Sequence, residues 1–175
     1  MISFTMNQDK ALQTLLWILN KKQGIDIYNI MKIVFAADCY HLTKYGRPVY
    51  GDKYMAMKDG TVPSFMYDLV RLKSNMPFFH CSKNGLQANS VPNMNFFSES
   101  DIEALEYGLK EYGDLKFGEI RDKNHQHRAW KKHENELKKN FGPKAIPIDY
   151  EDMIDDPEVI KDLIELGSMT ESMVL

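Results

Sequence analysis

The 175-residue sequence predicts a mainly α-helical domain of about six to eight helices with a small antiparallel β-hairpin or short sheet. Apolar side chains recur at intervals of three and four residues in several stretches, which is the spacing of one helix face. The pair Asn84-Gly85 separates two short apolar stretches and favours a tight type I′ turn. The hydrophobic fraction of 43% and the charged fraction of 27% are typical of a folded globular protein.

Two helices joined by a short turn are expected at the N-terminus. The first runs from about residue 8 to residue 22 and carries its leucines at helical spacing along one face. Gln23-Gly24 supplies the glycine that commonly ends a helix. Asp26 is placed to cap a second helix, which we expect to end near Thr43. Because the turn is short, the two helices are predicted to form an antiparallel pair.

The small sheet and a third helix are predicted in the middle of the chain. Residues 45–52 are too rich in glycine and proline for a helix, and residues 53–58 are expected to form a short strand. Pro63 fits the first turn of a third helix, where its missing N–H is harmless. Residues 78–88 form the predicted hairpin, which should pack on the helices or pair with the strand at 53–58.

Further helices are predicted in the second half, and the first of them begins at Ser98 or Ser100 and closes at Gly113. Prolines mark residues 141–148 as a connector. The other expected helices span residues 117–124, residues 128–139, and two segments that begin at Asp149 and at Asp156-Pro157 and end near Gly167. Residues 1–167 are therefore interpreted as one domain, followed by a flexible tail at 168–175.

The composition predicts a cytoplasmic protein without a membrane anchor. No apolar run approaches the roughly 20 residues of a membrane span, and residues 1–8 lack the features of a secretory signal. Cys39 and Cys81 form no CxxC pair, which favours a reducing compartment. The net charge of -3 gives no overall attraction to nucleic acid. Binding of nucleic acid through this chain alone is therefore not expected.

Charge is unevenly distributed in the last third of the chain. Residues 121–144 are mostly basic, whereas residues 149–165 are acidic apart from Lys161. One interpretation is two solvated helix faces that partly neutralise each other. The alternatives are that one segment binds a partner, or that the acidic tail shields the basic face.

Motifs that carry chemistry are few. The sequence contains no phosphate-binding loop, HExxH pair or GxSxG elbow, and we expect neither an enzyme nor a bound cofactor or metal. Asp38 and His41 share a helix face and are interpreted as buried hydrogen-bonding groups that fix the following turn. His125-Gln126-His127 could share a metal only from a strand or loop. The enzymatic alternative is a metal-dependent hydrolase built on Asp38, His41, His125 and His127.

Several short blocks follow one another along the chain: Lys32-Ile33-Val34-Phe35-Ala36-Ala37-Asp38, His41-Leu42, Tyr45-Gly46-Arg47-Pro48, Gly51-Asp52 with Tyr54 and Ala56, Asp59-Gly60-Thr61-Val62-Pro63, Gly113-Asp114, Asn124-His125 with Ala129-Trp130, and Ile146-Pro147-Ile148. Together they resemble the Panacea domain, also called the SocA-like antitoxin domain. Two of the blocks contain substitutions, since Thr61 replaces a usual proline and Asn124 replaces a usual threonine. The resemblance extends from about Lys10 to Leu166 and depends on the order and spacing of the blocks.

The resemblance implies an antitoxin that neutralises a cognate protein toxin, encoded nearby, by direct protein–protein contact. Some members of the family instead deliver a toxin to a cellular protease, so a proteolytic adaptor is one alternative. An accessory protein of a mobile element or phage, with no toxin, is another.

Large aromatic, histidine and arginine side chains near the family motifs could contact a partner. The hypothesised anchors are Tyr45, Arg47, Tyr54, His125, Arg128 and Trp130. For some a local role is the alternative, since Arg47 could pin a turn and Trp130 could lie in the core. The motif residues interpreted as structural are Asp38, His41, Gly46, Pro48, Gly51, Asp52, Gly60, Val62 and Pro63.

Overall fold

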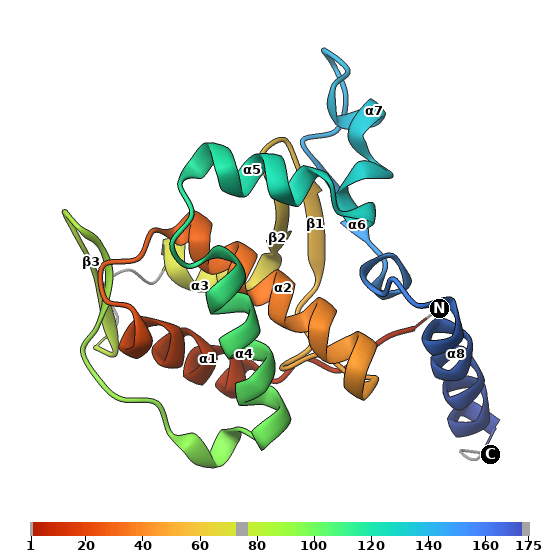
Figure 1. The fold of residues 1–175 in the computed structure, drawn as a ribbon, viewed down its shortest axis with the longest axis horizontal. Coiled ribbons are helices and arrows are strands. Elements are labelled where there is room, and N and C mark those ends of the chain that lie inside the picture. Colours follow the sequence, from red (N-terminus) through yellow and green to blue (C-terminus); the bar gives the residue numbers. More distant parts are fainter. Residues whose placement is uncertain (1, 73–76, 173–175) are drawn as a thin grey trace.

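The mainly helical fold with short antiparallel sheets is confirmed by the computed structural model, which describes residues 2–72 and 77–172 (Figure 1). Eight α-helices and two short 3-10 helices occur in these residues. The α-helices are α1 (Gln8–Lys21), α2 (Ile27–Tyr45), α3 (Ser64–Leu72), α4 (Glu99–Tyr112), α5 (Phe117–His125), α6 (Arg128–Lys131), α7 (Glu134–Leu137) and α8 (Pro157–Ser172). The 3-10 helices are η1 (Met94–Phe96) and η2 (Tyr150–Met153).

Helix α2 runs through the centre of the molecule. Asp26 caps its N-terminus, as predicted, by accepting a hydrogen bond from the Tyr28 N–H (2.7 Å). Gly46 ends the helix in the left-handed conformation (φ 71°), which a residue without a Cβ adopts at little cost. Residues on every side of α2 are buried, so the helix is enclosed by other elements instead of covering them from outside.

The first two helices run in opposite directions, but the closest helical neighbour of α2 is α4 (Figure 1). The backbones of α2 and α4 approach at Gly108, where a Cβ would lie 2.2 Å from the carbonyl oxygen of Ile33. A side chain at this position would separate the two helices. Helix α1 packs mainly against β4 (Gly85–Ala88), α3 and η1.

A three-stranded antiparallel sheet covers one side of α2 in the order β2 (Gly60–Pro63), β1 (Tyr54–Met57), β5 (Ala145–Ile148). The predicted strand at 53–58 is β1. The prediction of a connector at 141–148 is wrong for its second half, because β5 pairs with β1 and places Pro147 opposite Met55. An edge strand tolerates a proline, since the N–H that proline lacks can face away from the ladder.

The predicted hairpin is confirmed as β3 (Phe79–Ser82) paired with β4. Its turn is not type I′, because no described non-glycine residue has a positive φ. The positive φ falls on Gly85 (98°), which pairs with Ser82 as the first residue of β4. The hairpin packs on the helices and bridges Ile25 through Leu86, and it does not join the β1 sheet.

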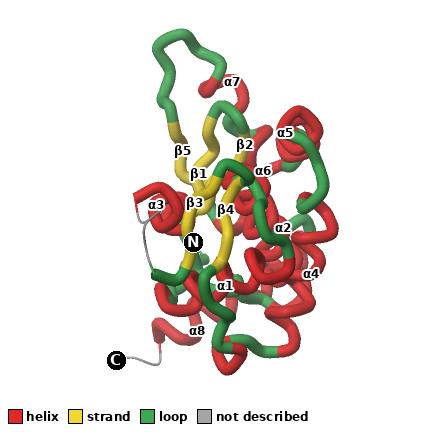
Figure 2. Tube along the Cα trace, turned by 90° about the vertical axis from the view of Figure 1, so that its left-hand side faces the viewer, coloured by secondary structure: helices red, strands yellow, loops and turns green. Residues whose placement is uncertain are grey.

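The C-terminal third departs most from expectation. The helix predicted at 128–139 is divided into α6 and α7, and the helix expected at Asp149 is the single 3-10 turn η2. Helix α8 continues to Ser172, five residues beyond the end predicted near Gly167, and residues 173–175 lie outside the described chain. In both views α8 lies at the opposite end from α7 (Figures 1 and 2), whereas the first part of the acidic segment meets the basic segment where Asp152 pairs with Lys132 (2.8 Å).

No helix within the described residues is long and apolar enough to cross a membrane.

Candidate functional site

The buried carboxylate of Asp38 connects α2 to the turn that follows it. Its oxygens accept hydrogen bonds from the Val49 N–H and the Tyr54 hydroxyl, both at 2.8 Å. Burial of the charge raises the pKa of Asp38 to about 7. Both partners are also buried. Asp38 is therefore placed to fix the turn and the start of β1, and it does not face a surface.

The carboxylate of Asp52 fixes the start of α3. It accepts hydrogen bonds from the N–H groups of Phe65 (2.9 Å) and Met66 (3.0 Å), which belong to the first turn of the helix, and from the Tyr50 hydroxyl (3.1 Å). Free N–H groups at a helix start require such an acceptor when they are buried. Burial raises the pKa of Asp52, while these hydrogen bonds oppose the rise.

A second charged cluster joins α1, the end of α2 and the start of α4. The carboxylate of Asp101 accepts from the Lys10 ammonium (2.6 Å) and the Arg47 guanidinium (2.9 Å), and its side chain is 1% exposed. His41 lies between the Arg47 carbonyl oxygen (2.6 Å) and the Ser100 hydroxyl (3.0 Å). Arg47 therefore pins the turn, which was the alternative to its role as a partner anchor.

Three of the family-like blocks meet at Gly60-Thr61. The buried Lys32 ammonium donates to the Thr61 carbonyl oxygen (2.7 Å). The Asn124 amide accepts from the Thr61 N–H (2.8 Å) and donates to the Thr61 hydroxyl (3.0 Å). A Cβ on Gly60 would lie 2.4 Å from the Asn124 oxygen. The two substituted positions, Thr61 and Asn124, are therefore hydrogen-bonded to each other.

The remaining hypothesised anchors have different environments. Tyr54 and Trp130, which we hypothesised as partner anchors, are each 2% exposed, so both lie in the core and not at a surface. The Trp130 indole donates to the Met57 carbonyl oxygen (2.7 Å), and the His125 ring stacks on it at 3.5 Å between centroids. Arg128 donates to the Ile154 carbonyl oxygen (2.8 Å).

The residues of the alternative hydrolase do not converge. Asp38 and His41 are buried in separate hydrogen-bond clusters. His125 stacks on Trp130, whereas the His127 ring packs edge-on against Phe35. Within residues 2–72 and 77–172, no three His, Cys, Asp or Glu side chains are arranged to hold a metal ion.

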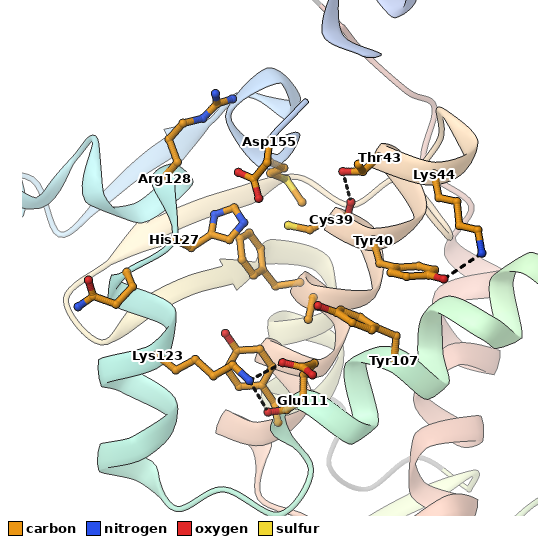
Figure 3. A pocket seen from close by; sticks show the side chains of 15 residues that line it. Cys39, Tyr40, Thr43, Lys44, Tyr107, Glu111, Lys123, His127, Arg128 and Asp155 are labelled. Atoms are coloured by element: carbon orange, nitrogen blue, oxygen red, sulfur yellow. Dashed lines mark hydrogen bonds and ion pairs between the residues drawn. The ribbon is translucent and has the colours of Figure 1, made fainter. Parts of the chain in front are cut away.

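A groove lies where α2, α4, α5, α6 and the end of η2 meet (Figure 3). Its volume is about 620 Å³. We call it the α2–α4 groove, and its lining residues are Phe35, Ala36, Cys39, Tyr40, Thr43, Lys44, Tyr107, Glu111, Tyr112, Lys123, Gln126, His127, Arg128, Met153 and Asp155.

Aromatic rings give the α2–α4 groove its apolar surface. Tyr40 of α2 and Tyr107 of α4 stack with their centroids 4.7 Å apart, and Tyr107 is 40% exposed. Tyr45, which is 41% exposed, follows Lys44 at the same end of α2 and donates a hydrogen bond to Glu103. Large tyrosine side chains with satisfied or exposed hydroxyls are typical of the central contacts in protein interfaces.

The polar groups of the groove are mostly held in place within the chain. Lys123 forms an ion pair with Glu111 (2.5 Å), and Lys44 pairs with Glu103. Asp155 is exposed and has no ion pair among the described residues. Burial lowers the pKa of the His127 imidazole and raises that of the Cys39 thiol, so at neutral pH both are uncharged. The arrangement can bind a polar and aromatic surface, and it offers no activated nucleophile.

Sequence reasoning missed this groove. The groove brings together elements that are far apart in the chain, which contribute Tyr40, Tyr107 and Asp155. A tyrosine at the edge of an apolar helix face is, moreover, expected to be a core residue. The basic segment 121–144 is visible in the sequence as a possible partner-binding segment, but of its basic residues only Lys123 and Arg128 line the groove.

One family model matches residues 30–131, more than half of the chain, and its description is "Antitoxin SocA-like, Panacea domain". All groove residues except Met153 and Asp155 lie inside this matched segment. No match was found among the curated proteins or among the solved structures.

Proposed function

The chain belongs to the SocA-like, Panacea-domain antitoxin family, and we propose that it neutralises a cognate protein toxin by binding it directly through the α2–α4 groove. The observation that carries the proposal is the stacked pair of the half-buried Tyr40 and the exposed Tyr107, in a groove that lies almost wholly within the family segment. We propose that this binding takes place in the cytoplasm. The cysteines Cys39 and Cys81, which are both free thiols, are compatible with a reducing compartment.

The physical mechanism is occlusion of the toxin. An interface of about 800 Å² on each partner supports tight binding when a few aromatic anchors are buried at its centre. Tyr107 is the aromatic side chain that has most surface left to bury in the groove. Because Lys123 and Lys44 are already paired, little side-chain entropy is lost when a partner covers them. Asp155 is available to accept a hydrogen bond from a cation of the toxin.

Co-expression with the product of the adjacent open reading frame tests the proposal. The neighbour alone should stop growth, and this chain should restore growth and co-purify with the neighbour at a stoichiometric ratio. A harmless neighbour, or restored growth without a complex, contradicts direct neutralisation.

The same cells separate occlusion from delivery to a protease. After new synthesis is blocked, occlusion predicts that the level of toxin stays constant while the chain is present. A toxin that disappears faster with the chain than without it would support the proteolytic adaptor instead.

A further inference from the structure

A second cavity lies at the tip of the hairpin formed by β1 and β2. Its volume is about 540 Å³, and it is enclosed by the first half of α2, the tip of that hairpin, and the arm that connects α7 to β5. Apolar and aromatic side chains form its walls, and among them the rings of Tyr28 and Phe117 are in contact with 4.5 Å between centroids. We call it the lysine cavity because of the charges described next.

Positive charge dominates the lysine cavity. Lys58, Lys139 and Lys144 lie at its exposed edge, and none of the three has an ion pair or hydrogen bond from its ammonium within the described residues. The one carboxylate among the lining residues is Asp59. The chain as a whole is acidic, with a net charge of -3, so this concentration of unpaired lysines is local. In the α2–α4 groove, by contrast, Lys44 and Lys123 are neutralised by glutamates of the same chain.

A fourth lysine lies buried beneath the wall of the cavity. Lys32 is 0% exposed, and its ammonium lies 4.4 Å from the centroid of the Tyr28 ring and 2.7 Å from the Thr61 carbonyl oxygen. No carboxylate lies within ion-pair distance of it in the described chain. A buried ammonium that lacks a counter-ion is unfavourable. Burial accordingly lowers the pKa of Lys32 to about 7.

The arm beside the cavity carries an aromatic side chain that packs on nothing. Phe141 lies between Lys139 and Lys144 in sequence and is fully exposed. The arm projects from the body of the protein (Figure 1). An exposed phenylalanine flanked by unpaired lysines combines the apolar and cationic contacts that a protein partner with the opposite charge would use.

We propose that the lysine cavity and Phe141 bind an acidic segment of the toxin, one that places Asp or Glu side chains at the lysines and an apolar residue against Tyr28 and Phe117. The inference rests on the proposed function, because the occupant is part of the toxin. Charge complementarity selects this occupant, since three exposed ammonium groups in one cavity lack counter-ions that a carboxylate-bearing segment would supply. The apolar walls require that the segment also carry a side chain able to bury area there.

The test measures affinity of the purified toxin for a double charge reversal, Lys139→Glu with Lys144→Glu. The matched control is Lys83→Glu with Lys161→Glu, which makes the same change of net charge at exposed lysines of the β3–β4 turn and of α8. Thermal unfolding of each variant verifies folding. Because each reversal converts attraction into repulsion, we expect the test variant to bind about 30-fold more weakly and the control to change by less than about threefold.

The affinity of the wild-type protein should also fall as salt is raised, and this dependence should weaken in the test variant. Equal affinities of the test and control variants would overturn the assignment of the lysine cavity while leaving neutralisation of the toxin intact. Failure of the wild-type chain to bind the toxin at all would instead contradict the proposed function. A dimer that forms without toxin and is lost in the test variant would identify a second copy of the chain as the occupant, and would also overturn the assignment.

Discussion

Replacement of Asp101 by alanine should be among the most destabilising single changes in this protein. The carboxylate is 1% exposed, and it compensates Lys10, whose side chain is only 11% exposed and therefore cannot regain full solvation. Arg47 is 42% exposed and can turn to solvent when its partner is lost. Asp101 also completes the capping box of α4, in which it accepts from the Ser98 N–H (2.8 Å).

The magnitude follows from these contacts. Removal of one partner from a buried ion pair costs about 3–5 kcal/mol, and the partial exposure of Lys10 places the ion-pair cost near the lower end. Loss of the capping interaction adds about 1 kcal/mol. We therefore expect Asp101→Ala to lower the free energy of unfolding by about 4 kcal/mol, which for a chain of this length corresponds to a Tm lower by about 8–16 °C.

Urea unfolding followed by circular dichroism measures this free energy, and a second variant tests its cause. If the unpaired Lys10 is the main source of the loss, Lys10→Met in the Asp101→Ala background should recover about 2 kcal/mol. The reasoning is refuted if Asp101→Ala costs less than about 1 kcal/mol, or if the added Lys10→Met change recovers nothing.

Variants at three further buried positions, Asp38, Gly60 and Asp52, give predictions that urea unfolding measures. Asp38 has a folded-state pKa raised to about 7, so the folded protein holds a proton on Asp38 that the unfolded chain releases. The free energy of unfolding should therefore fall as the pH rises from about 4 to about 7, and Asp38→Asn should remove the contribution of Asp38 to this fall. Gly60→Ala should cost about 2 kcal/mol, because the φ of 122° is strained for alanine and its Cβ would meet Asn124. Asp52→Ala should cost about 3 kcal/mol by leaving two buried N–H groups of α3 without an acceptor, whereas Asp52→Asn, which keeps one acceptor, should cost less.

Elements defined by local chemistry could be predicted from the sequence. Asp26 and Ser98 cap α2 and α4 as expected, because each cap depends on residues within one helical turn. Elements defined by distant pairing could not. β5 is only four residues long, and it becomes a strand because β1, about 90 residues earlier, offers a free edge. The break between α6 and α7 likewise lies in a polar segment where helical spacing alone carries little information.

The buried hydrogen-bonding groups could be predicted in part, whereas the α2–α4 groove could not. The position of Asp38 on a helix face predicts a buried hydrogen-bonding group, whereas a structural role of Asp52 follows only from the family motif. Their partners Val49 and Phe65 lie 11 and 13 residues further along the chain. Tyr107 did not stand out, because its partner Tyr40 comes from another helix and only the packing of α2 on α4 brings them together. Trp130 was expected at a surface or in the core, and its size and its single N–H are accommodated in the core.

The most direct test of the central claim, that the α2–α4 groove binds the toxin, is calorimetric titration of the toxin with Tyr107→Ala and with Phe78→Ala as its control. Both residues are aromatic and similarly exposed, at 40% and 39%, but Phe78 precedes β3, away from the groove. Loss of an aromatic anchor costs about 2 kcal/mol or more, so Tyr107→Ala should weaken binding by about 30-fold while Phe78→Ala leaves it unchanged. Equal affinities of the two variants, with the wild-type complex intact, would contradict the groove as the toxin-binding surface.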